Sequence, residues 1–316
     1  MRITRKFLLR KLRWLLLATF LTMNVVAYFH AYKFTHFSVE KIEKTKGANH
    51  LSSLDKAKTL LFGVNNPRPT NKGVPTVSFE SVWLGTNGKT AGWWMPVDSS
   101  RGTVVLFHGY SGEKYSMLDK AYVFRKLGYS TFLVDFMGSG ESYGNQTTIG
   151  FFEANQVQLA YQFLREKGEE TIFLFGTSMG AVAVLKAVKD YDLDANGLIL
   201  ECPFGSMLET VQARFRSMQI PSFPMANLLV FWGGVQNGFN AFSHKPSLYA
   251  KNVSCPTLLM HGQLDEKVSS DEIRRIYNNL SGPKTLVVYP LAGHENYLNK
   301  YAERWTQDVG FFLSQN

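Results

Sequence analysis

Apolar and polar stretches alternate in a regular order along the chain from Thr103 onward. Short apolar runs rich in Val, Ile, Leu and Phe are separated by longer stretches without helix breakers. Such runs predict buried strands, and strands that alternate with helices indicate βαβ units and a mostly parallel sheet. The clearest predicted strands lie at 103–107, 171–175, 197–201, 256–261 and 284–289.

Two further apolar runs, near 76–84 and 89–97, precede the alternating part. They are separated by Thr86, Asn87 and Gly88. Asn-Gly between apolar runs is a strong hairpin signal. We therefore expect an antiparallel hairpin that leads into the parallel sheet.

Residues 203–250 break the alternation between two predicted strands. The stretch is rich in Phe, Met, Trp, Gly and Pro, which predicts a helical cap inserted above the sheet. An apolar cap favours a substrate with an apolar acyl or alkyl group. We expect Met207, Phe231 and Trp232 to contact it; the alternative is that the apolar residues form the core of the cap itself. The full set considered is Met207, Phe215, Met218, Phe223, Met225, Leu228, Phe231 and Trp232.

The pentapeptide Gly-Thr-Ser-Met-Gly at 176–180 carries the most specific chemistry. It follows the apolar run 171–175 and precedes 181–188, which has no helix breaker. A Gly-x-Ser-x-Gly between a strand and a helix predicts a nucleophile elbow, in which a sharp turn exposes the serine hydroxyl. Ser178 is the predicted nucleophile. Without that context the pattern would indicate an ordinary strand-to-helix turn.

A serine nucleophile needs a base and a third group that orients the base. Asp265 follows the predicted strand 256–261, and His294 lies on the loop after the predicted strand 284–289. The order Ser, acid, His is the one expected along the chain. We predict Asp265 as the acid and His294 as the base; a turn aspartate and a surface histidine are the alternatives. Asp271 reads instead as a first-turn helix residue.

The oxyanion hole needs two backbone N–H groups. The residue after the nucleophile, Met179, is the first predicted donor, and Tyr110, in the loop after the strand 103–107, is the second. His108 and His261 precede glycines at strand ends and are expected to order loops. Contact of His244 with a substrate stays open.

These segments together resemble the α/β-hydrolases. The similarity is to the branch with monoacylglycerol lipases, serine-aminopeptidase-like hydrolases and small bacterial esterases, and it covers about 76–314. One departure is Met137, where that family often has Arg in a turn after a strand; Asp135 in the same turn is expected to order it. The matching segments are 108–112, 135–142, 176–180, 261–265 and 293–294.

The N-terminus predicts a membrane segment. Six basic residues occur before Trp14, and 14–32 then contains no charged residue, which is long enough for one crossing. The basic flank would stay in the cytoplasm and the folded domain outside. A cleaved signal peptide ending near Ala27 and a buried helix are the alternatives. Either of the first two exports the domain, as a single-pass membrane protein or as a secreted or periplasmic one.

Three parts follow from this pattern. Residues 1–32 form the basic anchor or signal segment, 33–75 a linker with a short amphipathic helix, and 76–316 the catalytic domain. The apolar positions Leu51, Leu54, Ala57, Leu61 and Phe62 predict that this short helix docks on the domain. A chain that begins near Lys33 is expected to be soluble and active.

Charge and composition exclude other classes of function. The formal net charge is +9, of which six charges precede Trp14, leaving 9 − 6 = +3 for the rest. That balance gives no basic face for nucleic acid. We expect no cofactor and no metal site, because no zinc-ligand spacing and no phosphate-binding loop occurs. Cys202 and Cys255 are expected to be free thiols.

The sequence therefore predicts a serine hydrolase that cleaves carboxylic esters with an apolar group. A thioesterase, peptidase or amidase on the same triad is the alternative. A membrane-anchored binding protein on an inactive hydrolase fold is a third reading, since fold alone does not fix function. The oligomeric state does not follow from the sequence.

Overall fold

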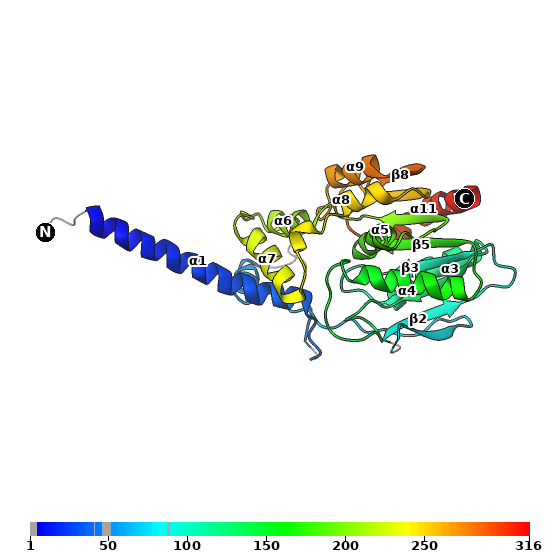
Figure 1. The fold of residues 1–316 in the computed structure, drawn as a ribbon, viewed down its shortest axis with the longest axis horizontal. Coiled ribbons are helices and arrows are strands. Elements are labelled where there is room, and N and C mark those ends of the chain that lie inside the picture. Colours follow the sequence, from blue (N-terminus) through cyan, green and yellow to red (C-terminus); the bar gives the residue numbers. More distant parts are fainter. Residues whose placement is uncertain (1–4, 41, 46–51, 87–88) are drawn as a thin grey trace.

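The computed structural model describes residues 5–40, 42–45, 52–86 and 89–316 (Figure 1). Eight strands form one sheet in the order β1-β2-β4-β3-β5-β6-β7-β8. β2 is antiparallel to both its neighbours, whereas the strands from β4 to β8 run parallel. The strands are β1 (Glu80–Leu84), β2 (Thr90–Met95), β3 (Thr103–Phe107), β4 (Ser130–Val134), β5 (Ile172–Thr177), β6 (Gly197–Glu201), β7 (Thr257–Gly262) and β8 (Lys284–Tyr289).

The predicted hairpin and parallel sheet are confirmed. β1 and β2 pair from Glu80 with Trp94 to Leu84 with Thr90. The turn residues Asn87 and Gly88 lie outside the described residues. The mostly parallel sheet with an N-terminal antiparallel hairpin is the architecture of an α/β-hydrolase.

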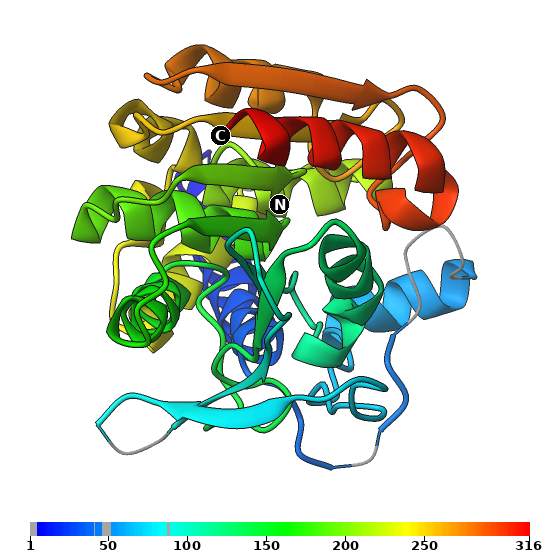
Figure 2. The same ribbon diagram turned by 90° about the vertical axis from the view of Figure 1, so that its right-hand side faces the viewer.

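The central strands are apolar throughout because helices cover both faces of the sheet (Figure 2). Val105 and Phe107 belong to the cluster that contains residues of α4 and α5, whereas Val104 and Leu106 belong to the cluster with α3 and α11. The covering helices are α3 (Leu118–Lys126), α4 (Glu153–Glu166), α5 (Met179–Tyr191), α9 (Ser270–Asn279), α10 (Tyr297–Lys300) and α11 (Ala302–Gln315), with the 3₁₀ helix η2 (Lys114–Met117).

The segment between β6 and β7 is helical, as expected for an insertion. Its two main helices, α6 and α7, lie beyond the end of the sheet at which the parallel strands finish (Figure 1). Ser206 caps α6 by accepting from the Glu209 backbone N–H, whereas no residue of α7 is charged. The elements are α6 (Met207–Ser217), α7 (Met225–Asn237), η3 (Ala241–Ser243), α8 (Pro246–Tyr249) and η4 (Ala250–Asn252).

One long N-terminal helix, α1 (Arg5–Thr35), projects from the domain (Figure 1). Its part from Lys6 to Thr35 is long and apolar enough to cross a membrane. Most of its large apolar side chains are exposed, for example Leu16 at 61 %. The C-terminal third of α1 is not surrounded by solvent, because Ala27 and Ala31 are buried against the rest of the protein.

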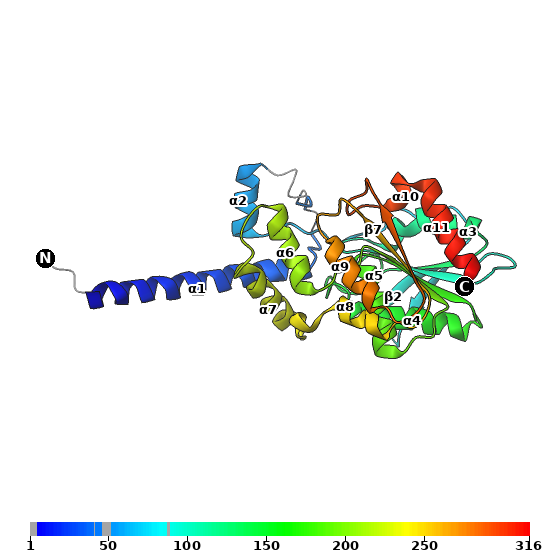
Figure 3. The same cartoon turned by 90° about the horizontal axis from the view of Figure 1, so that it is seen from above.

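This third of α1 packs on α7 of the insertion (Figure 3). The Trp232 indole N–H donates to Asn24 Oδ1 at 3.1 Å, and Gln236 Nε2 donates to the Tyr28 carbonyl at 2.8 Å. The Trp232 ring also meets the Tyr28 ring edge-on at 5.3 Å. The division between anchor and domain near residue 32 therefore cuts through a packed interface.

The chain after α1 is also bonded to the domain. The Phe37 backbone N–H donates to the Asn145 carbonyl, and Phe37 is buried. The short helix α2 (Ser53–Phe62) lies beside α1, and Lys33 Nζ donates to the Phe62 carbonyl at 2.6 Å. Leu54 and Phe62 are 65 % and 69 % exposed, so the prediction that these two dock on the domain is wrong. The bond from Lys33 to the Phe62 carbonyl is one contact that holds α2 beside α1.

Candidate active site

Ser178 lies on a strained turn between β5 and α5. Its φ of 52° and ψ of −110° are an unfavourable conformation for a residue with a Cβ. The Ser178 backbone N–H donates to the Glu201 carbonyl at 2.8 Å, which fixes the turn against β6. The sharp strand-to-helix turn expected of a nucleophile elbow is present.

The two glycines of the pentapeptide are required by close backbone approach. A Cβ on Gly176 would lie within 3 Å of backbone atoms of Gly180 and Ala181. A Cβ on Gly180 would lie within 3 Å of the Phe107 and His108 carbonyl oxygens. Glycine is therefore the residue that lets the turn fold tightly and lets β3 pass beside it.

The structure brings together the three side chains predicted as a triad. His294 Nε2 is 3.0 Å from Ser178 Oγ, and His294 Nδ1 is 2.8 Å from Asp265 Oδ2. The Asp265 side chain is fully buried, and that of His294 is 17 % exposed. Both His294 distances are within hydrogen-bond range. A proton can therefore pass from the Ser178 hydroxyl to the His294 ring while the Asp265 carboxylate holds the ring in place.

The surroundings of Asp265 favour its ionised form. Burial alone would raise the pKa of Asp265, but the hydrogen bond from His294 and backbone N–H groups lower it below its usual value. Lys267 N and Val268 N donate to Oδ1 at 2.8 and 2.9 Å, which leaves Oδ2 for His294. A carboxylate with these donors is oriented as well as charged.

The same contacts act on His294 in the opposite sense. Burial by itself would lower the pKa of His294, but the Cys202 sulfur and the Asp265 carboxylate beside the ring raise it above the usual value. The Cys202 sulfur, an Asp265 carboxylate oxygen and a ring nitrogen of His294 lie within 4.8 Å of one another. The ring therefore accepts a proton readily.

The predicted oxyanion donors lie on the two loops that meet at Ser178. Met179 is the first residue of α5 and is buried. A Cβ added to Gly109 would lie 3.7 Å from Ser178 Cβ, so the loop that carries Tyr110 passes directly beside the serine. The Tyr110 hydroxyl donates to the Phe34 carbonyl at 2.7 Å, which ties this loop to α1.

Asp135 orders its turn, as expected. Its Oδ1 accepts from Lys114 N at 2.7 Å, and its Oδ2 accepts from Lys114 Nζ and Glu141 N at 2.5 and 2.9 Å. A Cβ on Gly140 would overlap this carboxylate. Asp135 is fully buried and serves the fold.

Three other histidines have structural partners. His108 Nε2 accepts from Phe136 N at 3.0 Å, and His261 Nε2 lies 3.2 Å from Ser270 Oγ. His244 is fully buried and bonds Tyr249 and the Ile149 carbonyl. Burial lowers the pKa of His244 to about 4, so it is a neutral packing residue, and it does not line the cavity next to His294.

A cavity of about 1010 Å³ adjoins His294. Its walls come from α6, α7, α1 and the loop 293–295. Met207 lines it, as predicted, together with Phe215, Met218 and Met225 from the same predicted set. The lining is mainly apolar and suits an acyl chain.

Phe231 and Trp232 do not line this cavity, so their contact with substrate stays a prediction that the cavity does not support. Trp232 packs on Tyr28 and bonds Asn24, and Phe231 is 48 % exposed on the outer side of α7. Because α7 is apolar on all sides, its composition did not reveal which side faces the cavity. The residues of α7 that line the cavity are Met225, Leu229, Val230 and Gly233.

The sequence interpretation missed two contributions to this site. Cys202 follows the last residue of β6, next to the strand that carries Ser178, and this adjacency was the available signal. Ala31 and Phe34 of α1 line the cavity. The sequence feature that could have indicated this is the spacing of Asn24, Ala27, Ala31 and Phe34, which places them along one face of a helix.

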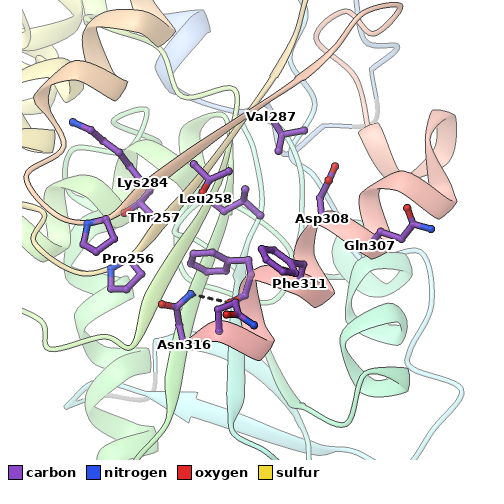
Figure 4. A pocket seen from close by; sticks show the side chains of 13 residues that line it. Pro256, Thr257, Leu258, Lys284, Val287, Gln307, Asp308, Phe311 and Asn316 are labelled. Carbon is purple, nitrogen blue, oxygen red and sulfur yellow. Dashed lines mark hydrogen bonds between the residues drawn. The ribbon is translucent and has the colours of Figure 1, made fainter.

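A second hollow, of about 310 Å³, lies between β7, β8 and α11 (Figure 4). It is lined near the start of the strands by Thr257 and Lys284, whereas Ser178 follows the end of β5. Asp308 and Lys284 are its charged residues. It lies away from the triad and contains no nucleophile.

Comparisons with known proteins agree with this fold. The model of the serine aminopeptidase S33 family matches residues 98–251. The uncharacterized protein YqkD of Bacillus subtilis is 26 % identical over 215 residues, or 67 % of this chain and 70 % of that protein. The lysophosphatidylserine lipase ABHD12 of Xenopus tropicalis is 23 % identical over 292 residues, or 88 % of this chain and 72 % of that protein.

A solved structure supports the same fold. The esterase Pf2001 of Pyrococcus furiosus superposes with a TM-score of 0.66 at 21 % identity, covering 79 % of this chain and 96 % of the esterase. Sheet order, elbow and sequence similarity all lead to one assignment. The chain has the α/β-hydrolase fold, and its sequence is similar to the serine aminopeptidase S33 family over residues 98–251.

Proposed function

We propose that this protein is a serine hydrolase of carboxylic esters with an apolar acyl group. The observation that carries the proposal is His294, which bridges Ser178 Oγ at 3.0 Å and Asp265 Oδ2 at 2.8 Å. In this mechanism His294 takes the proton of Ser178 as the hydroxyl attacks the ester carbonyl. Asp265 holds the ring in the tautomer that leaves Nε2 free to accept.

The negative oxygen that forms needs donors which are already in place. The backbone N–H groups of Met179 and Tyr110 are the proposed pair. His294 then gives its proton to the leaving alcohol, which leaves an acyl ester on Ser178. Water attacks that ester with His294 again as base, and the free acid departs.

The cavity supports an acyl chain as the apolar part of the substrate. Its volume of about 1010 Å³ and its lining by side chains such as Phe215, Met218 and Met225 suit a long alkyl chain. One relative, a lysophosphatidylserine lipase, is by its name an enzyme of the same kind. Cleavage of thioesters or amides would use the same groups.

We further propose that α1 is a retained membrane anchor, with the domain outside the cytoplasm. The apolar part of the helix lies behind a basic flank. Cleavage near Ala27 would remove Asn24, which accepts from Trp232, and would shorten the face that packs on α7. The contacts of α1 with α7 therefore favour retention over a signal peptide.

The triad should behave as a unit. Asp265→Asn and His294→Ala are each expected to lower kcat for p-nitrophenyl butyrate by at least about 10³-fold. The double variant should be no slower than the slower single variant, because each change already disables the same proton transfer. Steady-state kinetics on the folded proteins, checked by circular dichroism, measures this. Additive losses would mean that the two side chains act separately.

The pH profile should reflect the raised pKa of His294. The proposed base works as neutral imidazole, so log kcat/KM should rise with pH and level off above the pKa. Because Asp265 and Cys202 raise the pKa of His294, the midpoint is expected above pH 7 rather than near the usual 6.5. A midpoint at or below 6.5, with the fold intact across the range, would contradict the environment described for His294.

The cavity should set the preferred chain length. A Cβ on Gly233, which lines the cavity on α7, would meet no atom within 4 Å. Gly233→Leu is therefore expected to fill cavity space and to lower kcat/KM about tenfold for a dodecanoyl ester but little for an acetyl ester. Val235→Leu, at a 55 % exposed position on the same helix, is the matched control. Equal profiles for the two variants would exclude this cavity as the acyl site.

A further inference from the structure

One cation in the cavity has no acidic partner. Arg214 lies on α6, and its guanidinium carbon is 3.6 Å from the centre of the Phe34 ring and 5.6 Å from that of Tyr110. Among the described residues, no carboxylate pairs with Arg214 and no side-chain hydrogen bond of its guanidinium occurs. The residues outside the described ranges include no Asp or Glu, so none of them can supply a carboxylate for Arg214. The positive charge is therefore not neutralised within the protein.

Removing the charged Arg214 guanidinium from water costs free energy. Burial lowers the pKa of Arg214 to about 10, although the neighbouring Tyr110 opposes the shift. Arg214 is still protonated at neutral pH. Stacking on Phe34 and Tyr110 offsets only part of the cost of leaving water, whereas an anion at hydrogen-bond distance would offset much more.

Two lysines stand at the same end of the cavity. Lys267 follows Asp265 by two residues, and burial and then the Arg214 charge lower the pKa of Lys267. Burial and the Lys267 charge in turn lower the pKa of Lys44, whose Nζ donates to Ser111 Oγ at 2.8 Å. Both lysines line the same cavity as Arg214 and are exposed to solvent.

Two carboxylates also line the cavity. Glu295 accepts from Lys300 Nζ and from Gly293 N, both at 3.0 Å, so its charge is already matched. Glu266 is an exposed residue of the loop between Asp265 and Lys267. Asp265 offsets part of the charge of Lys267 and Glu113 part of that of Lys44, whereas Arg214 has no such acid near it among the described residues.

We infer that Arg214, with Lys267 and Lys44, binds a phosphate or carboxylate on the alcohol part of the ester. The inference rests on the proposed function and names the substrate class for the same site. The apolar walls of α6 and α7 take the acyl chain, while the cations lie beside Tyr110 and the loop of Asp265. A planar guanidinium binds two anion oxygens at once, which makes Arg214 the main determinant.

Three esters with the same dodecanoyl chain test this directly. They are monododecanoyl glycerol, its 3-phosphate and the corresponding ester of glyceric acid. The full-length protein in non-ionic detergent is expected to show kcat/KM at least about tenfold higher for one or both anionic esters than for the neutral one. Preference for the phosphate or for the glycerate identifies which anion the site prefers. Equal rates on all three would overturn the inference.

Arg214→Gln should remove the preference, so that kcat/KM for the anionic esters falls to about the value for the neutral ester. Arg216→Gln, at an exposed position on the same helix, is the matched control and should keep the preference. A purely structural Arg214 would give a different result, namely an equal loss on all three esters together with a lower melting temperature. That result would overturn the inference.

A measurement on the unaltered protein guards against misfolding of the variant. Hexyl phosphate should inhibit hydrolysis of p-nitrophenyl butyrate at a concentration at least about tenfold lower than hexanol does. Equal inhibition would overturn the inference. Failure of the proposed function looks different, because none of the esters would then be hydrolysed by any form of the protein.

Discussion

Ser178→Ala is expected to lower kcat for p-nitrophenyl esters by about 10⁴- to 10⁶-fold. The change removes the oxygen that lies 3.0 Å from His294 Nε2 and leaves the strained turn in place. The two glycines that shape the turn are unchanged, so the circular dichroism spectrum and melting temperature should match those of the unaltered protein.

A serine on the surface provides the control for this variant. Ser314→Ala, at an exposed position in α11, should leave kcat within about twofold. Turnover that persists in folded Ser178→Ala protein, above the level of the buffer, would remove Ser178 from the mechanism.

Removal of residues 1–32 is expected to lower kcat/KM for dodecanoyl esters at least about tenfold. The truncation deletes Ala27 and Ala31, which pack on α7, and with Ala31 one wall of the cavity. It also exposes the apolar side of α7 around Trp232, so the shortened protein should aggregate without detergent. This reverses the expectation from the sequence that a chain beginning near Lys33 would be soluble and fully active.

A chain that begins at Asn24 is the matched control. It lacks most of the membrane segment but keeps the partner of Trp232 and the buried alanines of α1. It should retain the activity of the full-length protein on dodecanoyl esters. Equal activity of the two shortened proteins would show that α1 is an anchor only and contributes nothing to the cavity.

Much of the site could be predicted because its signals are local. Gly176 and Gly180 flank Ser178 between an apolar strand and a helix, and Asp265 and His294 each follow an apolar strand. Parallel strands finish at one end of a sheet, so residues that follow them converge without further information. The hairpin of β1 and β2 had an equally local signal in its Asn-Gly turn.

The missed features depend on which side of a helix faces which neighbour. α7 is apolar on all sides, so its composition did not separate Gly233, on the cavity side, from Phe231, on the exposed side. α1 read as a membrane segment because its apolar length matches a bilayer, and the small buried face of Ala27 and Ala31 was hidden within it. Arg214 looked like an ordinary helix cation, and only the fold shows that it has no acid beside it.

The most direct test of the account is to locate the covalent adduct of a fluorophosphonate probe. Such probes react with a serine whose hydroxyl is activated by a neighbouring base. The full-length protein is expected to take up one probe, and peptide mass spectrometry should place it on Ser178. His294→Ala and Ser178→Ala proteins should stay unlabelled. Ester hydrolysis without any adduct, or an adduct on another residue that abolishes activity, would contradict the role of Ser178.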